Sequence, residues 1–500
     1  MEAVLGEGAV AQSALESCFG EIILSAQAPE PATVLFGATM NLGSRHRLAI
    51  AAIFLLLAAG CAAKPRTLMP TPLVYREAGG PPLFEQRVEF SPTVDLLYIT
   101  DRGRPTAEEE EEDPSLPYGE TRGRRIAFGS AAVRMGPALT WDEVVTQSRL
   151  SERTRDVDLA LGDVVELGAY PPEPYDIEAL PNGAIIRAPE FQARHDRASE
   201  VLVSEFDRRL ATSPTKEVLL FVHGFNETFA TAAFTTAELC HFLGREPVCA
   251  FFTWPASHTG NFLISYTNTT ESAQYAEDHL KKAIRLLASQ PGVERVHLLA
   301  HSRGAALMLS AAHKLLIESI AAGHEPVESL KLGELILFSP DVDMEIAAQR
   351  ITAYISDPDL ITAWPERRLP RGLHGQLTIY TSPEDRALLV SRILFRSRHR
   401  LGQLTAEDLK PEGQRFLAKT GKVNLITYEG KRTDLFGHSY FTTNPEVSSD
   451  LVQLLRYDKR LGEPGRELIR TGPVTWEFPT AEAKEGGSRV ASTSGTVFID

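Results

Sequence analysis

From about residue 216 to residue 460, the chain alternates between short apolar runs and longer segments with helical periodicity. The short runs have the length and composition of buried strands. They lie at residues 217–222, 296–300, 335–338, 376–381 and 423–428. Helical periodicity covers residues 229–242, 271–289, 303–321 and 448–457. Strands that alternate with helices predict an α/β fold with a mostly parallel central sheet and helices on both faces.

The segment before this region, residues 86–215, has a different pattern. It contains strand-like pieces such as residues 96–100 and an acidic run at 108–113, which we interpret as a solvated loop. We therefore expect a β-rich N-terminal subdomain docked on the sheet of the 216–460 domain. Residues 461–500 are expected to form a C-terminal extension that ends in a loose tail rich in Gly, Ser and Thr.

An apolar run at residues 48–60 ends at Cys61 and follows the basic cluster Arg-His-Arg at 45–47. The run is shorter than the about 20 residues of a membrane span and fits the hydrophobic part of a signal peptide. Its end, Leu-Ala-Ala-Gly-Cys, resembles a bacterial lipobox, in which the thiol of Cys61 is diacylated. An ordinary cleaved signal or a short buried helix remain the alternatives. The Pro-rich residues 62–85 would then form a tether from the membrane.

Residues 1–39 do not fit a signal peptide, because they contain five acidic residues and no Lys or Arg. A signal of ordinary length, residues 40–60, begins at Met40. We therefore expect translation to start at Met40, and a peptide from residues 1–39 found in native cells would contradict this.

The run at residues 296–304, Val-His-Leu-Leu-Ala-His-Ser-Arg-Gly, predicts a strand, a sharp turn and the start of a helix, with Ser302 at the turn. Such a nucleophile elbow exposes the serine oxygen at the carboxyl edge of a sheet. The small residues Ala300 and Gly304 allow the strand and helix backbones to pass close together. A turn residue or a helix cap is the alternative role for this serine.

Partners for Ser302 follow in the order expected of an α/β-hydrolase fold, which is serine, acid and then histidine. His438 is the histidine that follows the last predicted strand, 423–428. The acid usually follows the second strand after the nucleophile, which selects Asp385, although its neighbour Glu384 also fits. Asp343, with Asp341 beside it, follows the preceding strand and is the alternative acid.

Each of these residues has a chemical role. His438 would take the proton of Ser302 during attack, and Asp385 would orient and stabilise the imidazole. The oxyanion of the tetrahedral intermediate needs backbone N–H donors, for which we expect the amide groups of Arg303 and Phe225. Taken singly, Asp385 could instead cap the helix predicted at residues 386–393.

These motifs resemble the bacterial α/β-hydrolase family known as domain of unknown function 900. The resemblance covers about residues 90–460 and rests on Phe-Val-His-Gly-Phe-Asn (221–226), Phe-Thr-Trp-Pro (252–255), Ala-His-Ser-Arg-Gly (300–304), Ser-Pro-Asp-Val-Asp (339–343), Tyr-Thr-Ser-Pro-Glu-Asp (380–385) and Gly-His-Ser-Tyr-Phe (437–441). It implies a serine-hydrolase triad of Ser302, Asp385 and His438. Thr269 stands where members of the family often have Asp, which removes support for substrate contacts borrowed from that loop.

Aromatic residues near these motifs suggest an apolar pocket for the acyl group of a substrate. They are Phe225, Phe229, Trp254 and Tyr266. Packing in the protein core explains the same residues equally well. The expected substrate is a small-molecule or lipid ester, because the triad suits a carboxylic esterase or a lipase-like enzyme. The same triad would also cleave an amide or a thioester.

The composition limits the other possibilities. A formal net charge of −15 disfavours binding to nucleic acid and electrostatic adhesion to anionic lipid. No motif for a metal or for a dinucleotide cofactor is present, so no cofactor and no metal are expected. Cys240 and Cys249 could form a disulfide in an oxidising compartment or could be two buried thiols.

The sequence therefore predicts a serine hydrolase of the bacterial cell envelope, held at the membrane by a lipid anchor at Cys61. Ala62 after the cysteine favours the outer membrane, with the enzyme facing the periplasm. A non-enzymatic envelope protein that uses the same fold for binding is the alternative. The oligomeric state, any partner proteins and a possible lid at residues 344–375 are left open.

Overall fold

The computed structural model describes residues 66–76, 80–84, 91–256, 262–356 and 371–480. The signal segment, Cys61 and the tail at residues 482–500 lie outside the described residues. Side chains are described for all of these ranges except at residues 262–263 and 352–356.

One large sheet organises the described chain. Its strands lie in the order β12-β13-β11-β10-β9-β8-β6-β7-β1-β2-β3. The strands of its centre, which pair in parallel, are β6 (Glu217–Val222), β7 (Val248–Thr253), β8 (Arg295–His301), β9 (Leu332–Phe338), β10 (Leu377–Thr381) and β11 (Val423–Thr427). The strands of its two ends are β1 (Thr93–Arg102), β2 (Arg122–Met135), β3 (Leu159–Ala169), β12 (Ile469–Arg470) and β13 (Thr475–Glu477). Because the central strands are parallel, their carboxyl ends, where the predicted site residues lie, meet at one edge.

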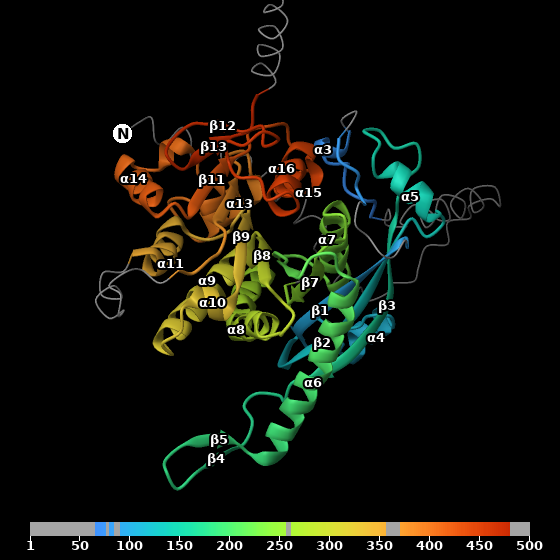
Figure 1. The fold of residues 1–500 in the computed structure, drawn as a ribbon, viewed down its shortest axis with the longest axis vertical. Coiled ribbons are helices and arrows are strands. Elements are labelled where there is room, and N and C mark those ends of the chain that lie inside the picture. The colour runs from blue at the N-terminus through green and yellow to red at the C-terminus, as the bar shows by residue number, and fades with distance from the viewer. Residues whose placement is uncertain (1–65, 77–79, 85–90, 257–261, 357–370, 481–500) are drawn as a thin grey trace, which may run out of the picture. The chain divides into compact units, whose positions relative to one another are not determined.

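Helices cover both faces of this sheet (Figure 1), since successive strand residues point to opposite faces and both sets are apolar. One face packs against α6 (Pro189–Thr212), α8 (Phe262–Ala288), α9 (Arg303–Ala321) and α11 (Met344–Ser356). The other packs against α3 (Leu73–Arg76), α5 (Trp141–Gln147), α7 (Phe229–Phe242), α15 (Tyr440–Thr443) and α16 (Pro445–Leu455).

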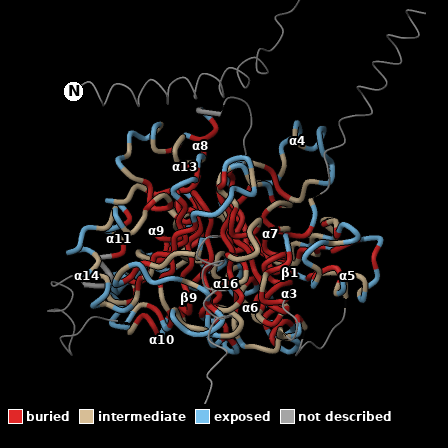
Figure 2. The backbone as a smooth tube through the Cα atoms, turned by 90° about the horizontal axis from the view of Figure 1, so that it is seen from above, coloured by how far each residue is buried: buried red, intermediate tan, exposed pale blue. Residues whose placement is uncertain are grey.

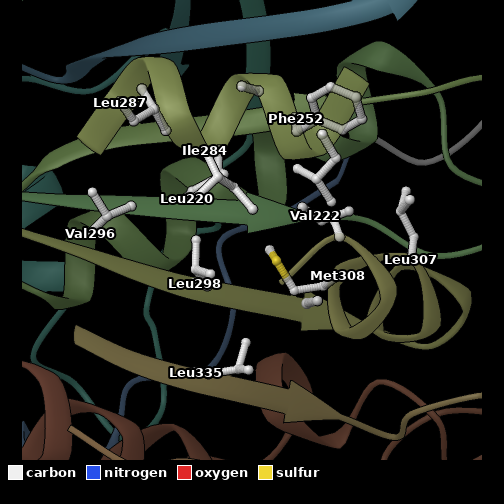
Figure 3. Close-up of a cluster of buried hydrophobic side chains, with 14 of the residues drawn as sticks. Leu220, Val222, Phe252, Ile284, Leu287, Val296, Leu298, Leu307, Met308 and Leu335 are labelled. Atoms are coloured by element: carbon white, nitrogen blue, oxygen red, sulfur yellow. The ribbon is translucent and has the colours of Figure 1, made fainter. Parts of the chain in front are cut away.

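Figure 3 shows part of the first core layer, where Leu220 and Leu298 from neighbouring strands meet Ile284 of α8 and Met308 of α9. The buried backbone gathers along the sheet between the two helical layers (Figure 2). The described elements also include further helices and a small hairpin. They are α4 (Ala107–Glu112), α10 (Pro326–Leu330), α13 (Arg386–Leu394), α14 (Pro411–Thr420), and the hairpin of β4 (Ile177–Ala179) and β5 (Ile185–Arg187).

The predicted elements of the 216–460 region are confirmed, with shifts at some ends. Helices α7 and α9 have the predicted limits. Helix α8 begins at Phe262, earlier than predicted, because the polar run Thr-Asn-Thr-Thr at 267–270 hides the periodicity of its first turns. The fold is therefore the predicted α/β class.

The predicted boundary between a β-rich subdomain and the sheet domain is wrong. Strand β1 pairs in parallel with β7, and β2 and β3 extend the same sheet. Residues 96–99 of β1 are almost fully buried, because the strand is covered on both faces. The strands before residue 216 therefore belong to the central sheet itself.

The predicted tether at residues 62–85 is also wrong from Arg66 onward. Leu68, Met69 and Tyr75 are buried in the second core layer. The backbone N–H of Met69 donates to the Glu238 carboxylate at 2.6 Å. Apolar residues between the prolines pack on α7 and α16, so this part of the chain forms a fixed contact instead of a spacer. Near the other terminus, β13 pairs with β11, so the C-terminal extension contributes to the sheet.

Two further features bear on the predicted localisation. Cys240 and Cys249 form a disulfide whose Cα atoms are 6.0 Å apart. Among the described residues, α9 alone is long and apolar enough to cross a membrane, and most of its apolar window is buried in the core. Helix α9 is therefore a core helix.

Candidate active site

Ser302 lies at the sharp turn between β8 and α9. Its backbone has φ 54° and ψ −123°, a strained conformation for a residue with a side chain. The turn is held from the neighbouring strand, because the N–H of Ser302 donates to the carbonyl of Phe338 at 2.9 Å. This conformation has the features of the predicted nucleophile elbow.

The elbow depends on two glycines that allow close backbone approach. A Cβ atom on Gly304 would lie 2.1 Å from the carbonyl oxygen of His223, so any larger residue would push α9 away from β6. A Cβ atom on Gly224 would lie 2.8 Å from the Cβ atom of Ser302. The loop after β6 therefore packs directly against the serine.

His438 and Asp385 meet at this edge of the sheet. The Nδ1–H of His438 donates to Oδ2 of Asp385 at 2.6 Å. The other carboxylate oxygen of Asp385 accepts the N–H of Leu388 at 3.1 Å and so caps α13. Asp385 thus fills both roles that the sequence left open. One oxygen ends a helix and the other orients the imidazole.

The electrostatic environment of His438 favours a basic imidazole. Burial alone would lower the pKa of His438, but the nearby carboxylate of Asp385 outweighs this and raises the pKa above its ordinary value. With Nδ1 held by Asp385, the proton acceptor of the neutral ring is Nε2.

Two other histidines next to the elbow are held neutral. Burial and the charge of His438 hold the pKa of His301 well below its ordinary value, and its Nε2–H donates to the carbonyl of His438 at 3.1 Å. Burial and Arg102 lower the pKa of His223 to about 3. Its Nδ1–H donates to the Gly224 carbonyl at 2.9 Å. Neither is placed to act as the base. Both hold the loops of the site.

His438 contacts His301, the residue that precedes Ser302 in the elbow. The rings of His301 and His438 have centroids 4.6 Å apart. Ser302 is 6% exposed, and its Oγ forms no hydrogen bond with another described residue. Hydrogen bonds between a nucleophile and its base are often long before substrate binds.

The two predicted oxyanion donors belong to segments that adjoin Ser302. Arg303 is the first residue of α9, where backbone N–H groups have no partner within the helix and the helix dipole favours negative charge. Phe225 follows Gly224, which packs on the serine, and the next residue, Asn226, has φ 60° and donates its N–H to Ala256 at 2.6 Å. These contacts fix the loop that carries the second donor.

The other candidate acids have different partners. Asp341 is buried and binds Tyr266, Ser391 and two arginines. Oδ1 of Asp343 accepts the N–H of Glu345 at 2.9 Å in the first turn of α11. Glu384 is exposed. None of them contacts the His438 ring in the described structure, so Asp385 is the acid that the fold brings to the histidine.

Two residues of the predicted aromatic pocket lie in the protein core. Phe229 packs against Tyr98 with ring centroids 5.2 Å apart. Trp254 is fully buried, and its Nε1–H donates to the His223 carbonyl at 3.1 Å. Trp254 therefore supports the loop after β6. The sequence pattern could not separate these packing roles from a pocket, and we assign both residues to packing.

Tyr266 and Phe225 remain beside the site. Their rings are in edge contact, with centroids 5.1 Å apart. The hydroxyl of Tyr266 accepts a hydrogen bond from the Arg303 guanidinium at 2.6 Å and donates to Asp341. Tyr266 thus connects the oxyanion loop to the side chain after the nucleophile.

Asp434 is a further residue of the site that the sequence analysis did not single out. Its carboxylate accepts the N–H groups of Phe436 (2.9 Å), Gly437 (2.6 Å), His438 (3.2 Å) and Ser439 (2.9 Å). An Asp at the start of a turn commonly binds backbone N–H groups of the residues that follow. The sequence Asp-Leu-Phe-Gly-His at residues 434–438 fits such a turn and could have indicated this role of Asp434. The hydrogen bonds of Asp434 hold the loop that carries His438.

The fold and this arrangement at the strand ends define an α/β hydrolase. A family model described as alpha/beta hydrolase of unknown function (DUF900) matches residues 198–457, which is more than half of the chain. The chain belongs to this family.

Other comparisons add little. No curated protein matches the chain. Among solved structures, the chain is similar to an esterase from Pyrococcus furiosus, with 10% identity, a TM-score of 0.25 and coverage of 49% of this chain and 81% of the esterase. It is also similar to carboxyl esterase 2 from the fungus Tuber melanosporum, with 14% identity, a TM-score of 0.24 and coverage of 48% and 77%. With scores of this size, neither similarity informs the activity of this chain.

Proposed function

We propose that this protein is a serine hydrolase that cleaves carboxylic esters through an acyl-enzyme on Ser302. The observation that carries the proposal is the hydrogen bond of 2.6 Å between His438 and Asp385, formed beside a strained serine elbow. A partly buried histidine with a raised pKa, whose Nε2 is the proton acceptor of the neutral ring, is suited to accept the serine proton.

The proposed reaction has two halves. Nε2 of His438 takes the proton of Ser302 as Oγ attacks the ester carbonyl, and the oxyanion is stabilised by the N–H groups of Phe225 and Arg303. The C–O bond to the alcohol then breaks, and His438 returns its proton to the leaving oxygen. In the second half, His438 deprotonates a water that attacks the acyl-enzyme, which releases the acid and restores Ser302.

We further propose that a lipid anchor at Cys61 holds the enzyme at a bacterial envelope membrane. The disulfide between Cys240 and Cys249 supports an oxidising compartment. Because Leu68 and Met69 are already buried in the folded domain, only a few residues of sequence separate this anchor from it. Cys61→Ser is expected to move the protein from the membrane fraction to the soluble fraction. An unchanged distribution would contradict the anchor.

The test of the catalytic proposal is covalent labelling by a fluorophosphonate probe, together with hydrolysis of 4-nitrophenyl butyrate. Both should be present in the wild-type protein and absent in Ser302→Ala. Ser339→Ala is the matched control, because Ser339 also ends a neighbouring strand at positive φ and contacts the His438 carbonyl. Labelling that survives in Ser302→Ala, or a folded wild-type protein that is not labelled, would contradict the proposal.

A further inference from the structure

A cavity of about 360 Å³ lies beside the elbow, and three arginines line it. Arg303 directly follows Ser302, Arg350 lies on α11 and Arg400 lies between α13 and β11. The lining also includes Val342 and Asp343 of the loop after β9, and in this loop the N–H of Asp341 donates to the Ser302 carbonyl at 3.0 Å. The cavity is therefore built on the same two strand ends that hold the nucleophile.

A single buried carboxylate serves two of these arginines. Asp341 lies 3.0 Å from Arg303 and 3.3 Å from Arg400, and it also accepts the hydroxyl groups of Tyr266 and Ser391. Arg303 and Arg400 are 7% and 3% exposed. The Nε–H of Arg303 has no hydrogen-bond acceptor within the described structure, whereas the Nε of Arg400 is the atom that lies 3.3 Å from Asp341. A buried N–H of a guanidinium without an acceptor is costly, so Arg303 retains unused capacity to bind an anion.

Arg350 adds a third positive charge at the rim of the cavity. Its guanidinium has a weak contact of 3.4 Å with the carbonyl of Ala306 and forms no ion pair with any described residue. Burial lowers the pKa of Arg350, and the charge of Glu277 only partly offsets this effect.

The carboxylates that face the cavity do not cancel these charges. Glu277 also lines the cavity; it forms an ion pair with Lys314, and its charge also acts on Arg350. Asp343 binds backbone N–H groups in the first turn of α11. The positive groups of the cavity and its ion pairs are Arg303, Arg350, Arg400 and Lys314, and the negative groups are Asp341, Asp343 and Glu277. Together they leave one positive charge in excess.

The remaining lining is apolar. The ring of Phe395 contacts two guanidinium groups, with its centroid 5.0 Å from the central carbon of Arg303 and 4.7 Å from that of Arg400. Leu307 and Val342 also line the cavity. A short alkyl chain that ends in one negative charge fits these walls, because the chain would contact the apolar residues and the charge would meet the arginines.

We infer that this cavity is a subsite for an organic carboxylate, so that the substrate is an ester that carries a free carboxylate in addition to the bond that is cleaved. The inference rests on the proposed function, since it names the substrate class of the site at Ser302. The planar guanidinium groups match a carboxylate, and the excess of one charge suits a monoanion.

The test is calorimetric binding to the full-length Ser302→Ala protein, which cannot turn over a substrate through Ser302. The probe is monomethyl glutarate, and its neutral match is dimethyl glutarate. The monoanion is expected to bind at least about tenfold more tightly than the diester, because only it engages the arginines. Equal affinities, or competition by sulfate that is as strong as that by the monoester, would overturn the inference.

Two variants in the Ser302→Ala background locate the site. Arg350→Gln is expected to remove the preference for the monoanion, whereas Arg350→Lys keeps the charge and retains part of it. Arg415→Gln is the matched control, because Arg415 is an exposed arginine on α14, outside the cavity lining. A preference that persists in Arg350→Gln would overturn the assignment of the site.

This binding test is independent of the proposed chemistry. If the wild-type protein is labelled at Ser302 but the monoanion shows no preference, the hydrolase proposal stands and the subsite fails. If the monoanion binds through Arg350 but no labelling occurs, the subsite stands and the hydrolase proposal fails.

Discussion

Two carboxylates end neighbouring parallel strands of this sheet, and the fold uses them in opposite ways. Asp341 follows β9 and Asp385 follows β10. Asp341 is surrounded by arginines and hydroxyl groups. Burial alone would raise the pKa of Asp341, but the charge of Arg303 and, to a smaller extent, that of Arg400 hold the pKa below its ordinary value. Asp385 has one oxygen bound to a helix N-terminus and the other bound to His438.

The difference shows that a position at a strand end does not by itself make an acid catalytic. Asp341 has no oxygen left for an imidazole, because two hydroxyl groups and two guanidinium groups surround it. Asp385 orients the imidazole of His438 because few other donors compete for its second oxygen. The donors that surround each acid therefore decide its role.

Asp385→Asn should have the largest effect on activity. We expect kcat/KM to fall about 10⁴-fold, because an amide would favour the wrong tautomer of His438. The free energy of unfolding should fall by no more than about 1 kcal/mol, because Asn also caps a helix. Steady-state hydrolysis and urea unfolding measure the two effects. An active Asp385→Asn protein would show that another acid orients the histidine.

Asp341→Asn should show the reverse pattern. Removing the charge leaves Arg303 and Arg400 buried together without a carboxylate, so we expect the free energy of unfolding to fall by about 3–5 kcal/mol. Below the unfolding transition, fluorophosphonate labelling of Ser302 should persist. A protein of unchanged stability that is no longer labelled would reverse the roles we assign to the two acids.

Asp434→Ala should have an intermediate effect on both properties. The carboxylate binds four backbone N–H groups of the loop that carries His438, so its loss should reduce the free energy of unfolding by about 2 kcal/mol. The activity should fall with it, because the imidazole is less well positioned. Asp434→Asn keeps one acceptor oxygen and is expected to lose less. Equal losses in the two variants would argue against an ordering role for these hydrogen bonds.

The smallest effect is a shift in pH dependence. His438 must be neutral to accept a proton, so kcat/KM should fall as the pH drops through the pKa of His438. Since the pKa of His438 is raised, the midpoint should lie above the ordinary value of about 6.5. Residual activity in Asp385→Asn should have its midpoint at lower pH. A midpoint that rises in this variant would contradict the assigned coupling.

The sequence predicted the elements that depend on local pattern. The elbow at Ser302 requires small residues at fixed spacing, and the strand order selected Asp385 and His438, so these positions were readable without a structure. The roles of Asp341 and Asp434 were not, because they depend on which donors surround each carboxylate in space. Arg400, for example, reaches Asp341 from a loop far along the chain.

The sequence also did not show which residues pack in the protein core. Aromatic residues such as Phe229 and Trp254 occur both in ligand pockets and in protein cores. Only their burial in the structure distinguishes the two roles. The prolines around Leu68 and Met69 suggested a spacer, yet the apolar residues between them pack on the domain. The boundary at residue 216 failed because β1 pairs with β7, a long-range contact that no local pattern indicates.

The most direct test of the central claim is the rate of fluorophosphonate labelling of Ser302 in four proteins: wild type, Asp385→Asn, His438→Ala and the double variant. If Asp385 acts through His438, the double variant should react at nearly the rate of His438→Ala alone, because residues that act as a unit are strongly non-additive. If the two losses multiply instead, Asp385 and His438 act independently, and the proposed triad is wrong.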